Sequence, residues 1–294
     1  MKSFLLAAAV FAGMIAIPRT SLDAQGPAGA SESTAPVAFE VAAVKQNKSG
    51  TPMIRFGMQP GGRFTAENVP LRELLRFAFQ VQPFQIEGLP SWANSDRFDV
   101  TAKAEGDIPP AQPGQAGPIQ FMMRTLLAER FGLVFHNETR EMPISELVLA
   151  RADGKLGPKL EKSTTDCQAL FAARRGGGPP PAPPAFGAKM QCGFRVGPGT
   201  IAGGSAPVSQ LANFLSQNMG RTVVDKTGLA GNYDFEVTYT PDQIPNLNGA
   251  PAPVDPNGPS LSTALQEQLG LKLESQRGPV TMFIVDKVSQ PTPD

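Results

Sequence analysis

An internal repeat is the feature that most constrains how this chain folds. The residues from Gly62 to Gly106 predict a strand, a helix and two further strands, and a similar pattern returns from Gly199 onward. A period this long indicates two domains or two halves, because solenoid repeats span about 20–50 residues. Seven positions recur at a spacing of 137 residues, namely Gly62, Phe64, Pro70, Leu71, Leu74, Leu75 and Ala78 against Gly199, Ile201, Pro207, Val208, Leu211, Ala212 and Leu215.

The repeat continues into a second helix in each copy. One is predicted at residues 119–131, where Gly132 is a typical C-terminal cap, and residues 263–271 resemble its end at a spacing of 138. Two strands follow each helix, with turns predicted at Met142-Pro143 and between Gly278 and Pro279, so each pair reads as a hairpin. We therefore predict an α+β fold with two tandem copies of a β-α-β-β, linker, α-β-β module, whose small mixed sheets are each packed by helices.

Apolar periodicity predicts the elements of the first copy and their buried faces. Strands are expected at residues 39–45, 53–59, 84–86 and 97–102, a helix opens at Asn68-Val69-Pro70, and residues 88–94 form a turn. The residues expected to share one face are Leu71, Leu74, Leu75 and Ala78 in the helix, Phe39, Val41 and Ala43 in the first strand, and Phe98 and Val100 in the last.

Composition indicates where the folded parts begin and end. The chain has 294 residues with 30 Gly and 30 Pro, and these are clustered. Lys2 precedes an apolar run of about 14 residues, which is typical of a signal peptide and short for a membrane span of about 20 residues. An uncleaved anchor is the alternative. The predicted parts are a signal peptide at 1–24, a disordered lead-in at 25–37, a first module at 38–150, a Gly/Pro-rich bridge at 151–197 and a second module at 198–290.

The two cysteines predict a compartment as well as a bond. In an exported chain an even pair indicates a disulfide, so Cys167 and Cys192 are expected to close a loop across the Gly/Pro-rich bridge. A redox pair is more often C-x-x-C, and two cysteines without nearby histidine make a poor zinc site. We expect a periplasmic or secreted protein with no membrane span once the signal is removed.

Several function classes lack their sequence signals. The formal net charge is zero, which does not favour nucleic-acid binding. No phosphate-binding loop and no dinucleotide fingerprint is present, and we expect no cofactor and no metal. His136 is the only histidine, so a catalytic triad would depend on this one residue of a predicted strand. A surface or hydrogen-bonded role is the simpler interpretation, and we identify no catalytic residues.

The acidic and aromatic residues near the predicted turns allow two interpretations. Asp96 and Asp99 in one copy, and Asp225 and Asp234 in the other, lie at strand ends, where acids form glycosidase pairs or calcium loops but also turns. Asp225 with Thr227 is expected to build a turn, and Asp99 and Asp234 to make one structural contact per copy. The candidate interaction surface comprises Trp92, Phe84 and Asp96, because the second copy lacks this aromatic set; core packing is the alternative.

Several phrases resemble a known family: GGRFTAENVPLRELLRFAF, PSWANSDRFDVTAKAEG, LLAERFGLVFHNETREMP and QLANFLSQNMGRTVVDKTGLAGNYDFEVTYTPD. The chain is similar over residues 38–291 to soil-associated exported proteins, expanded in Acidobacteria, that carry a domain of unknown function (DUF3738). Some relatives join this region to a membrane metallopeptidase of the antibiotic-sensor type, but its H-E-x-x-H motif is absent here. Each module also resembles the short N-terminal modules of secretins and TonB-dependent receptors, which implies a fold for protein interaction.

We accordingly predict an extracytoplasmic, non-enzymatic binding protein, with a sensory role as one form of it. Its partner is expected to be an envelope protein or a cell-wall or small-molecule ligand, and the oligomeric state is unknown. Exposed strand edges are the expected means of binding. The alternative is an extracellular hydrolase that uses acidic residues in a cleft between the modules.

Overall fold

The computed structural model describes residues 37–51, 53–109, 115–174, 190–242, 246–247, 250–251 and 254–291. The predicted signal peptide, residues 1–24, lies outside the described residues, as does the predicted lead-in, residues 25–37, except for its last residue. The fold is α+β, as predicted, with three four-stranded sheets and one two-stranded pair among the described residues.

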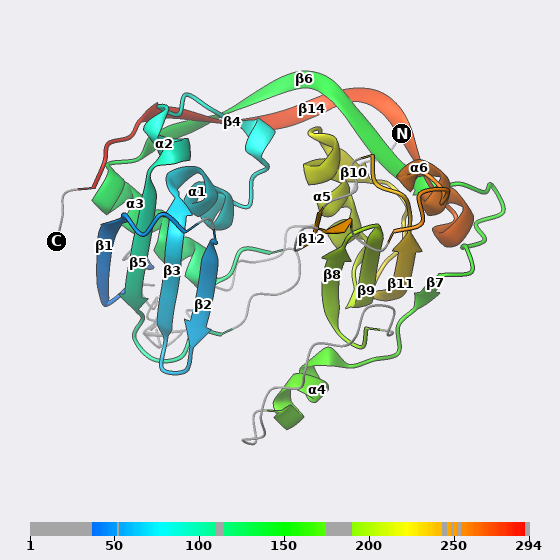
Figure 1. Ribbon diagram of the computed structural model, residues 1–294, viewed down its shortest axis with the longest axis horizontal. Helices are drawn as coiled ribbons and strands as arrows, with labels where there is room; N and C mark the ends of the chain where they lie inside the picture. The colour runs from blue at the N-terminus through cyan, green and yellow to red at the C-terminus, as the bar shows by residue number, and fades with distance from the viewer. Residues whose placement is uncertain are drawn as a thin grey trace, which may run out of the picture. The chain divides into compact units, whose positions relative to one another are not determined.

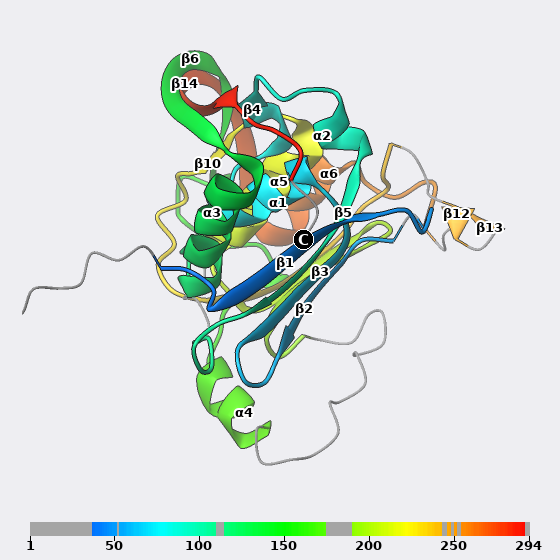
Figure 2. The same ribbon diagram turned by 90° about the vertical axis from the view of Figure 1, so that its left-hand side faces the viewer.

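The N-terminal sheet is antiparallel, and two helices cover one of its faces (Figures 1 and 2). Its strand order is β1-β5-β3-β2, so β1 and β2 are its edges. The elements are β1 (Val41–Asn47), β2 (Arg55–Gln59), β3 (Arg63–Pro70), β5 (Arg97–Lys103), α1 (Leu71–Phe79) and α3 (Pro118–Phe131).

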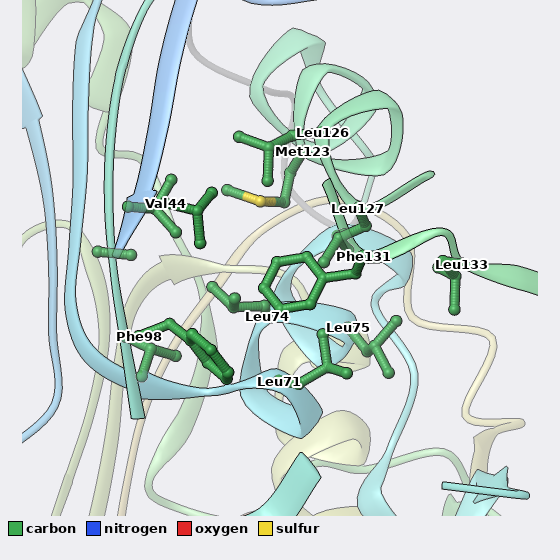
Figure 3. Close-up of a cluster of buried hydrophobic side chains, with 14 of the residues drawn as sticks. Val44, Leu71, Leu74, Leu75, Phe98, Met123, Leu126, Leu127, Phe131 and Leu133 are labelled. Carbon is green, nitrogen blue, oxygen red and sulfur yellow. The ribbon is translucent and has the colours of Figure 1, made fainter. Parts of the chain in front are cut away.

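The first hydrophobic core lies between this sheet and the two helices. The predicted helix face is confirmed, since Leu71, Leu74, Leu75 and Ala78 are all buried. Figure 3 shows Phe131 of α3 over Leu74 of α1, and the ring centroids of Phe131 and Phe98 are 5.2 Å apart. The core is therefore closed by contacts between α1, α3 and β5.

The predicted buried face of the first strand is wrong. Val41 is 63% exposed whereas Val44 is 1% exposed. Val44 pairs directly with Val100 and Ala42 with Ala102, and paired residues on neighbouring strands share a face. Because Val100 and Ala102 are buried, the even-numbered residues of β1 face the core, which a short alternating pattern without its partner strand does not reveal.

The residues after α1 differ in detail from the prediction. Residues 84–86, expected as a strand, form the end of a 3-10 helix η1 (Pro83–Gln85) and the start of β4 (Ile86–Glu87). The predicted turn at residues 88–94 includes the start of a short helix, α2 (Trp92–Ser95). The expected strand at 97–102 is confirmed as β5, with Phe98 and Val100 buried.

The C-terminal sheet is also antiparallel and has the order β7-β11-β9-β8. Two of its strands come from the predicted bridge, residues 151–197, so that segment contributes to the fold. A second core lies beneath this sheet. The elements are β7 (Leu160–Lys162), α4 (Cys167–Arg174), β8 (Gly193–Gly197), β9 (Thr200–Ala206), α5 (Val208–Met219), β11 (Tyr233–Thr238), α6 (Leu261–Ala264) and the π-helix η2 (Leu265–Leu269), with the pair β12 (Asn246–Leu247) and β13 (Ala250–Pro251).

Neither predicted hairpin forms. β6 (Val134–Leu149) and β14 (Leu271–Lys287) are continuous strands that pair antiparallel with each other, side by side along their lengths (Figure 1). Met142 lies opposite Gly278 and Pro143 opposite Arg277, within the ladder. With β4 and β10 (Val223–Asp225) added in parallel at its edges, this pair forms the mixed ribbon sheet.

The long pairing of β6 with β14 explains why the turns are absent. Phe283 and Val285, near the end of β14, belong to the first core, whereas Leu147, near the end of β6, belongs to the second. Each strand thus buries apolar side chains in both cores, which two separate hairpins would not allow. Only one of the three main sheets is mixed, contrary to the expectation of small mixed sheets.

Candidate functional site

The outer edge of β2 is the most exposed apolar strand edge among the described residues. Met53 and Ile54, just before the strand, and Phe56 and Met58 within it are exposed by 58%, 38%, 42% and 52%. β2 ends the strand order of the N-terminal sheet, so its outer side is paired with no described strand. An edge strand presents backbone N–H and C=O groups to any strand that approaches it.

The apolar residues of β2 continue the first core outward. Phe56 pairs with Ala66 and Met58 with Phe64, and both partners on β3 are buried. Phe56 and Met58 therefore point to the helix-covered side of the sheet. The Phe56 ring stacks on Phe77 of α1 with centroids 5.1 Å apart. The apolar face thus reaches the sheet edge and remains exposed there.

A hydrogen-bond network fixes the entry to β2. Asn68 has a left-handed backbone, with φ of 58°, and its N–H donates to Asp99 Oδ1 at 2.8 Å. Its side-chain amide donates to the carbonyls of Thr51 and Met53. Asn47 also donates to Asp99, at 2.8 Å. The predicted structural role of Asp99 is confirmed, and the network holds the chain that leads into the edge strand.

The exit from β2 is fixed by a tight glycine turn. Gly61 donates its N–H to Asp107 Oδ1 at 2.7 Å, and Gly62 has φ of 72°. A Cβ at Gly62 would lie 2.0 Å from the carbonyl oxygen of Gly106, so only glycine fits. Both ends of β2 are therefore held, and its outer edge is a preformed surface.

The C-terminal sheet has a comparable edge strand, β8, with less exposed apolar surface. The ring centroids of Phe194 and Phe214 of α5 are 6.0 Å apart, a contact that corresponds to that of Phe56 with Phe77 of α1. Val196 of β8 is 45% exposed. Cys192 directly precedes β8 and forms the predicted disulfide with Cys167 at the start of α4. The disulfide therefore joins the beginning of this edge strand to a neighbouring helix.

Asp234 makes the contact expected of it. Its carboxylate accepts the N–H of Ser205 at 2.8 Å, and Ser205 has φ of 45°, as Asn68 does beside Asp99. Asp225 accepts the N–H and hydroxyl of Thr227, which confirms the predicted turn. The acids singled out in the sequence thus hold backbone in place.

The predicted interaction residues are only partly brought together. Trp92 and Asp96 lie at the two ends of α2, whereas Phe84 is half-buried in the separate turn η1. Trp92 packs edge-on against Phe98, with centroids 6.3 Å apart, and Asp96 accepts from the Gln290 side chain at 2.6 Å. Packing and a hydrogen bond thus account for two of the three, and their role in binding stays a prediction.

His136 and Arg140 of β6 pair with acids on the surface. His136 Nδ1 lies 2.9 Å from Asp286, in line with a hydrogen-bonded role. Arg140 donates hydrogen bonds to Glu87 and Glu138. The bond from Arg140 lowers the pKa of Glu138, and the two acids raise the pKa of Arg140. No group of three or more His, Cys, Asp or Glu side chains in the described part of the chain is placed to hold a metal ion.

One hollow contains acids that the sequence did not single out together. It has a volume of about 280 Å³ and is lined by Glu161, Asp234 and Glu236 with Lys159. Glu161 pairs directly with Asp234 across β7 and β11, so their side chains share a face. Two features of the sequence could have indicated this hollow: the alternation of β11 and a strand within the predicted bridge. They indicate it only once the pairing of β7 with β11 is known.

A protein-family model matches most of the chain. Residues 72–288 match the model of a family described as "Protein of unknown function (DUF3738)". Neither a search of curated proteins nor a search of solved structures finds a match. Within the described residues, no helix has the length and apolar character needed to cross a membrane.

Proposed function

The chain belongs to the DUF3738 family of proteins of unknown function, and we propose that it is an extracytoplasmic, non-enzymatic binding protein. It pairs with its partner through the edge of β2. The observation that carries this proposal is an edge strand fixed at both ends with Ile54, Phe56 and Met58 exposed beside unpaired backbone. An extended segment gains backbone hydrogen bonds and side-chain burial when it joins such an edge.

The proposed location rests on the disulfide. The Cys167–Cys192 bond suits an oxidising compartment, since thiols in the cytosol are kept reduced. A periplasmic or secreted site is therefore proposed, and cleavage of the predicted signal at residues 1–24 remains a prediction. An envelope protein is the proposed partner, because it is the class that meets an exported chain.

We further propose that the two halves are copies of one module whose edge strands, β2 and β8, have diverged. The strand orders β1-β5-β3-β2 and β7-β11-β9-β8 correspond, as do the contacts of Phe56 with Phe77 and Phe194 with Phe214. The two tandem modules are thus proposed to include residues 151–197 in the second copy. In that copy the disulfide precedes the edge strand, and Val196 is the only large hydrophobic residue of β8 that is exposed.

Position-specific photo-crosslinking tests the proposed function. A benzophenone amino acid replaces Met58 on β2 or, as the matched control, Val41 on the opposite edge of the same sheet, where the side chain is 63% exposed. Each protein is irradiated with an envelope fraction. We expect an adduct from position 58 alone, competed by wild-type protein and not by the Phe56→Lys/Met58→Lys variant. Adducts of equal yield from both edges, or none from either, would refute the proposal.

Hydrolysis by acidic residues is the second candidate function, with the acids on the C-terminal sheet instead of in the expected cleft between the modules. The observation in its favour is the hollow lined by Glu161, Asp234 and Glu236. Asp234 accepts the N–H of Ser205, and the other two carboxyls that line the hollow, Glu161 and Glu236, are the pair to test. Activity on extracellular polysaccharides that falls at least about 100-fold in Glu161→Gln or Glu236→Gln would support it, and equal activity in all variants would exclude this pair.

A further inference from the structure

We propose that the strand accepted by β2 is an extended segment of a partner protein in which apolar and acidic residues alternate. This inference rests on the proposed function and adds the chemistry of the partner. The segment extends the N-terminal sheet by one strand, with its apolar side chains beside Phe56 and Met58 and its carboxylates on the opposite face.

The two faces of β2 differ in character. Ile54, Phe56 and Met58 face the same side of the sheet as the first core. Residues 55, 57 and 59 face the other side, where Arg55 is the only charge on the strand. Because successive side chains of any added strand also alternate, the same strand meets an apolar row on one face and Arg55 on the other.

Positive charge gathers on the helix-free face near β2. Arg55 and Arg63 lie on this face by the register of β2 and β3, and the segment 48–63, which also contains Lys48, has no acidic residue. Arg63 pairs directly with Lys103 across β3 and β5, and like charges opposite each other destabilise a sheet. A carboxylate on an added strand would lie on the same face as these cations, next to Arg55, and would reduce the excess of positive charge there.

The acids nearby offset only part of this charge: Asp99 pairs with Lys45 across β5 and β1, and Asp107 accepts the N–H of Gly61 at the exit of β2. Glu67 pairs with Arg55 in the register of β2 and β3, and Glu40 lies 3.5 Å from the Lys103 amine. Arg63 remains beside a like charge at the end of β2 where Gln59 is its other neighbour. The face is therefore basic overall, and it complements an acidic segment.

Charge also argues against a second copy of this chain as the occupant. Two β2 edges brought together would oppose two segments, residues 48–63, that carry basic residues and no acidic ones. The partner is therefore a different chain whose strand carries the acids. A second copy becomes an outcome of the test, seen as dimerisation without peptide.

Two synthetic peptides probe this surface. Both are N-acetylated and about nine residues long, enough to span β2 at about 3.3 Å per residue. One alternates Val with Glu and the other Val with Lys. Fluorescence anisotropy at low salt is expected to show the Glu peptide binding at least about tenfold more tightly, because each opposite-charge pair favours one and disfavours the other. The difference should shrink as salt is added.

Matched variants assign the binding to this edge. Arg55→Glu/Arg63→Glu should invert the preference in favour of the Lys peptide, and Phe56→Lys/Met58→Lys should abolish the binding of both. Val41→Lys/Lys45→Glu on the opposite edge strand, β1, should leave both affinities unchanged. Near-UV circular dichroism of each variant checks that the fold is kept.

The outcomes separate this inference from the proposed function. Equal affinity for both peptides, lost in Phe56→Lys/Met58→Lys, would show a strand-accepting edge without charge selection and overturn the inference alone. Binding indifferent to every β2 variant would overturn both. Concentration-dependent dimerisation abolished by Phe56→Lys/Met58→Lys, with neither peptide bound, would assign the edge to a second copy and overturn the acidic partner.

Discussion

At the scale of single residues, one device recurs in the two halves of the chain. Asp99 accepts the N–H of Asn68 and Asp234 accepts the N–H of Ser205, each at 2.8 Å. Asn68 and Ser205 both have positive φ, which is costly for residues other than glycine. The carboxylate stabilises this conformation three residues before the start of α1 in one half and of α5 in the other.

Replacing Asp99 by alanine should therefore destabilise the protein. The N–H of Asn68, a residue only 3% exposed, would lose its acceptor, at a cost of about 1–3 kcal/mol. Urea unfolding monitored by circular dichroism measures the change. Asp99→Asn is the matched control, because it keeps an acceptor oxygen and should lose less. An unfolding free energy within about 0.5 kcal/mol of wild type for Asp99→Ala would contradict the assigned role.

Tyr239 predicts a pH dependence at the alkaline end. Burial, and to a lesser extent the charge of Asp242, raises the pKa of Tyr239 above its usual value near 10. The folded state then holds the phenol proton more tightly than the unfolded state, so stability is full below about pH 10 and falls as pH rises further. Thermal unfolding between pH 8 and 11 should show a steeper loss in wild type than in Tyr239→Phe. Parallel curves would disprove it.

At the scale of secondary-structure elements, strand pairing decides what apolar periodicity alone does not. The face of α1 was predictable because its four apolar positions lie on one side. α3 has apolar residues around it, and Phe121, 41% exposed, lies against the Arg124 guanidinium with 4.9 Å to the ring centroid. β6 and β14 have turn-forming residues near their centres, yet each continues as one uninterrupted strand past those residues.

Phe283 near the chain's C-terminal end should stabilise the N-terminal half. It is 2% exposed in the first core, where its ring lies 4.6 Å from Phe79 of α1. Phe283→Ala should lower the unfolding free energy reported by Trp92 fluorescence by about 3–5 kcal/mol. Trp92 is a local reporter because it is the only tryptophan and packs against the same core. An unchanged Trp92 transition would show that β14 does not complete this core.

At the scale of the whole molecule, the ribbon sheet couples two cores that the repeat alone would leave separate. β6 carries Leu147 into the second core and Phe135 against the first, and β14 carries Leu271 and Phe283 in the same way. Loss of either core therefore frees parts of both long strands, so we expect the described halves to unfold as one cooperative unit.

A substitution in the second core tests this coupling. Leu211 of α5 is fully buried there, and Leu211→Ala should lower the unfolding free energy by about 2–5 kcal/mol. The transitions followed by Trp92 fluorescence and by circular dichroism should shift together to lower midpoints. Gln217→Ala on the exposed side of α5 is the control and should leave both in place. A Trp92 transition that stays at its wild-type midpoint in Leu211→Ala would mean that the halves unfold independently.

The sequence by itself determined the class of the fold, the face of α1, the disulfide and the structural use of Asp99 and Asp225, because each depends on residues whose spacing or chemistry is local. It also indicated exposed strand edges without saying which. The phase of β1, the exchange of β6 and β14 between the cores and the open edge of β2 were decided only by the tertiary structure. Which strands become neighbours depends on burial summed over both halves, and no local pattern carries that sum.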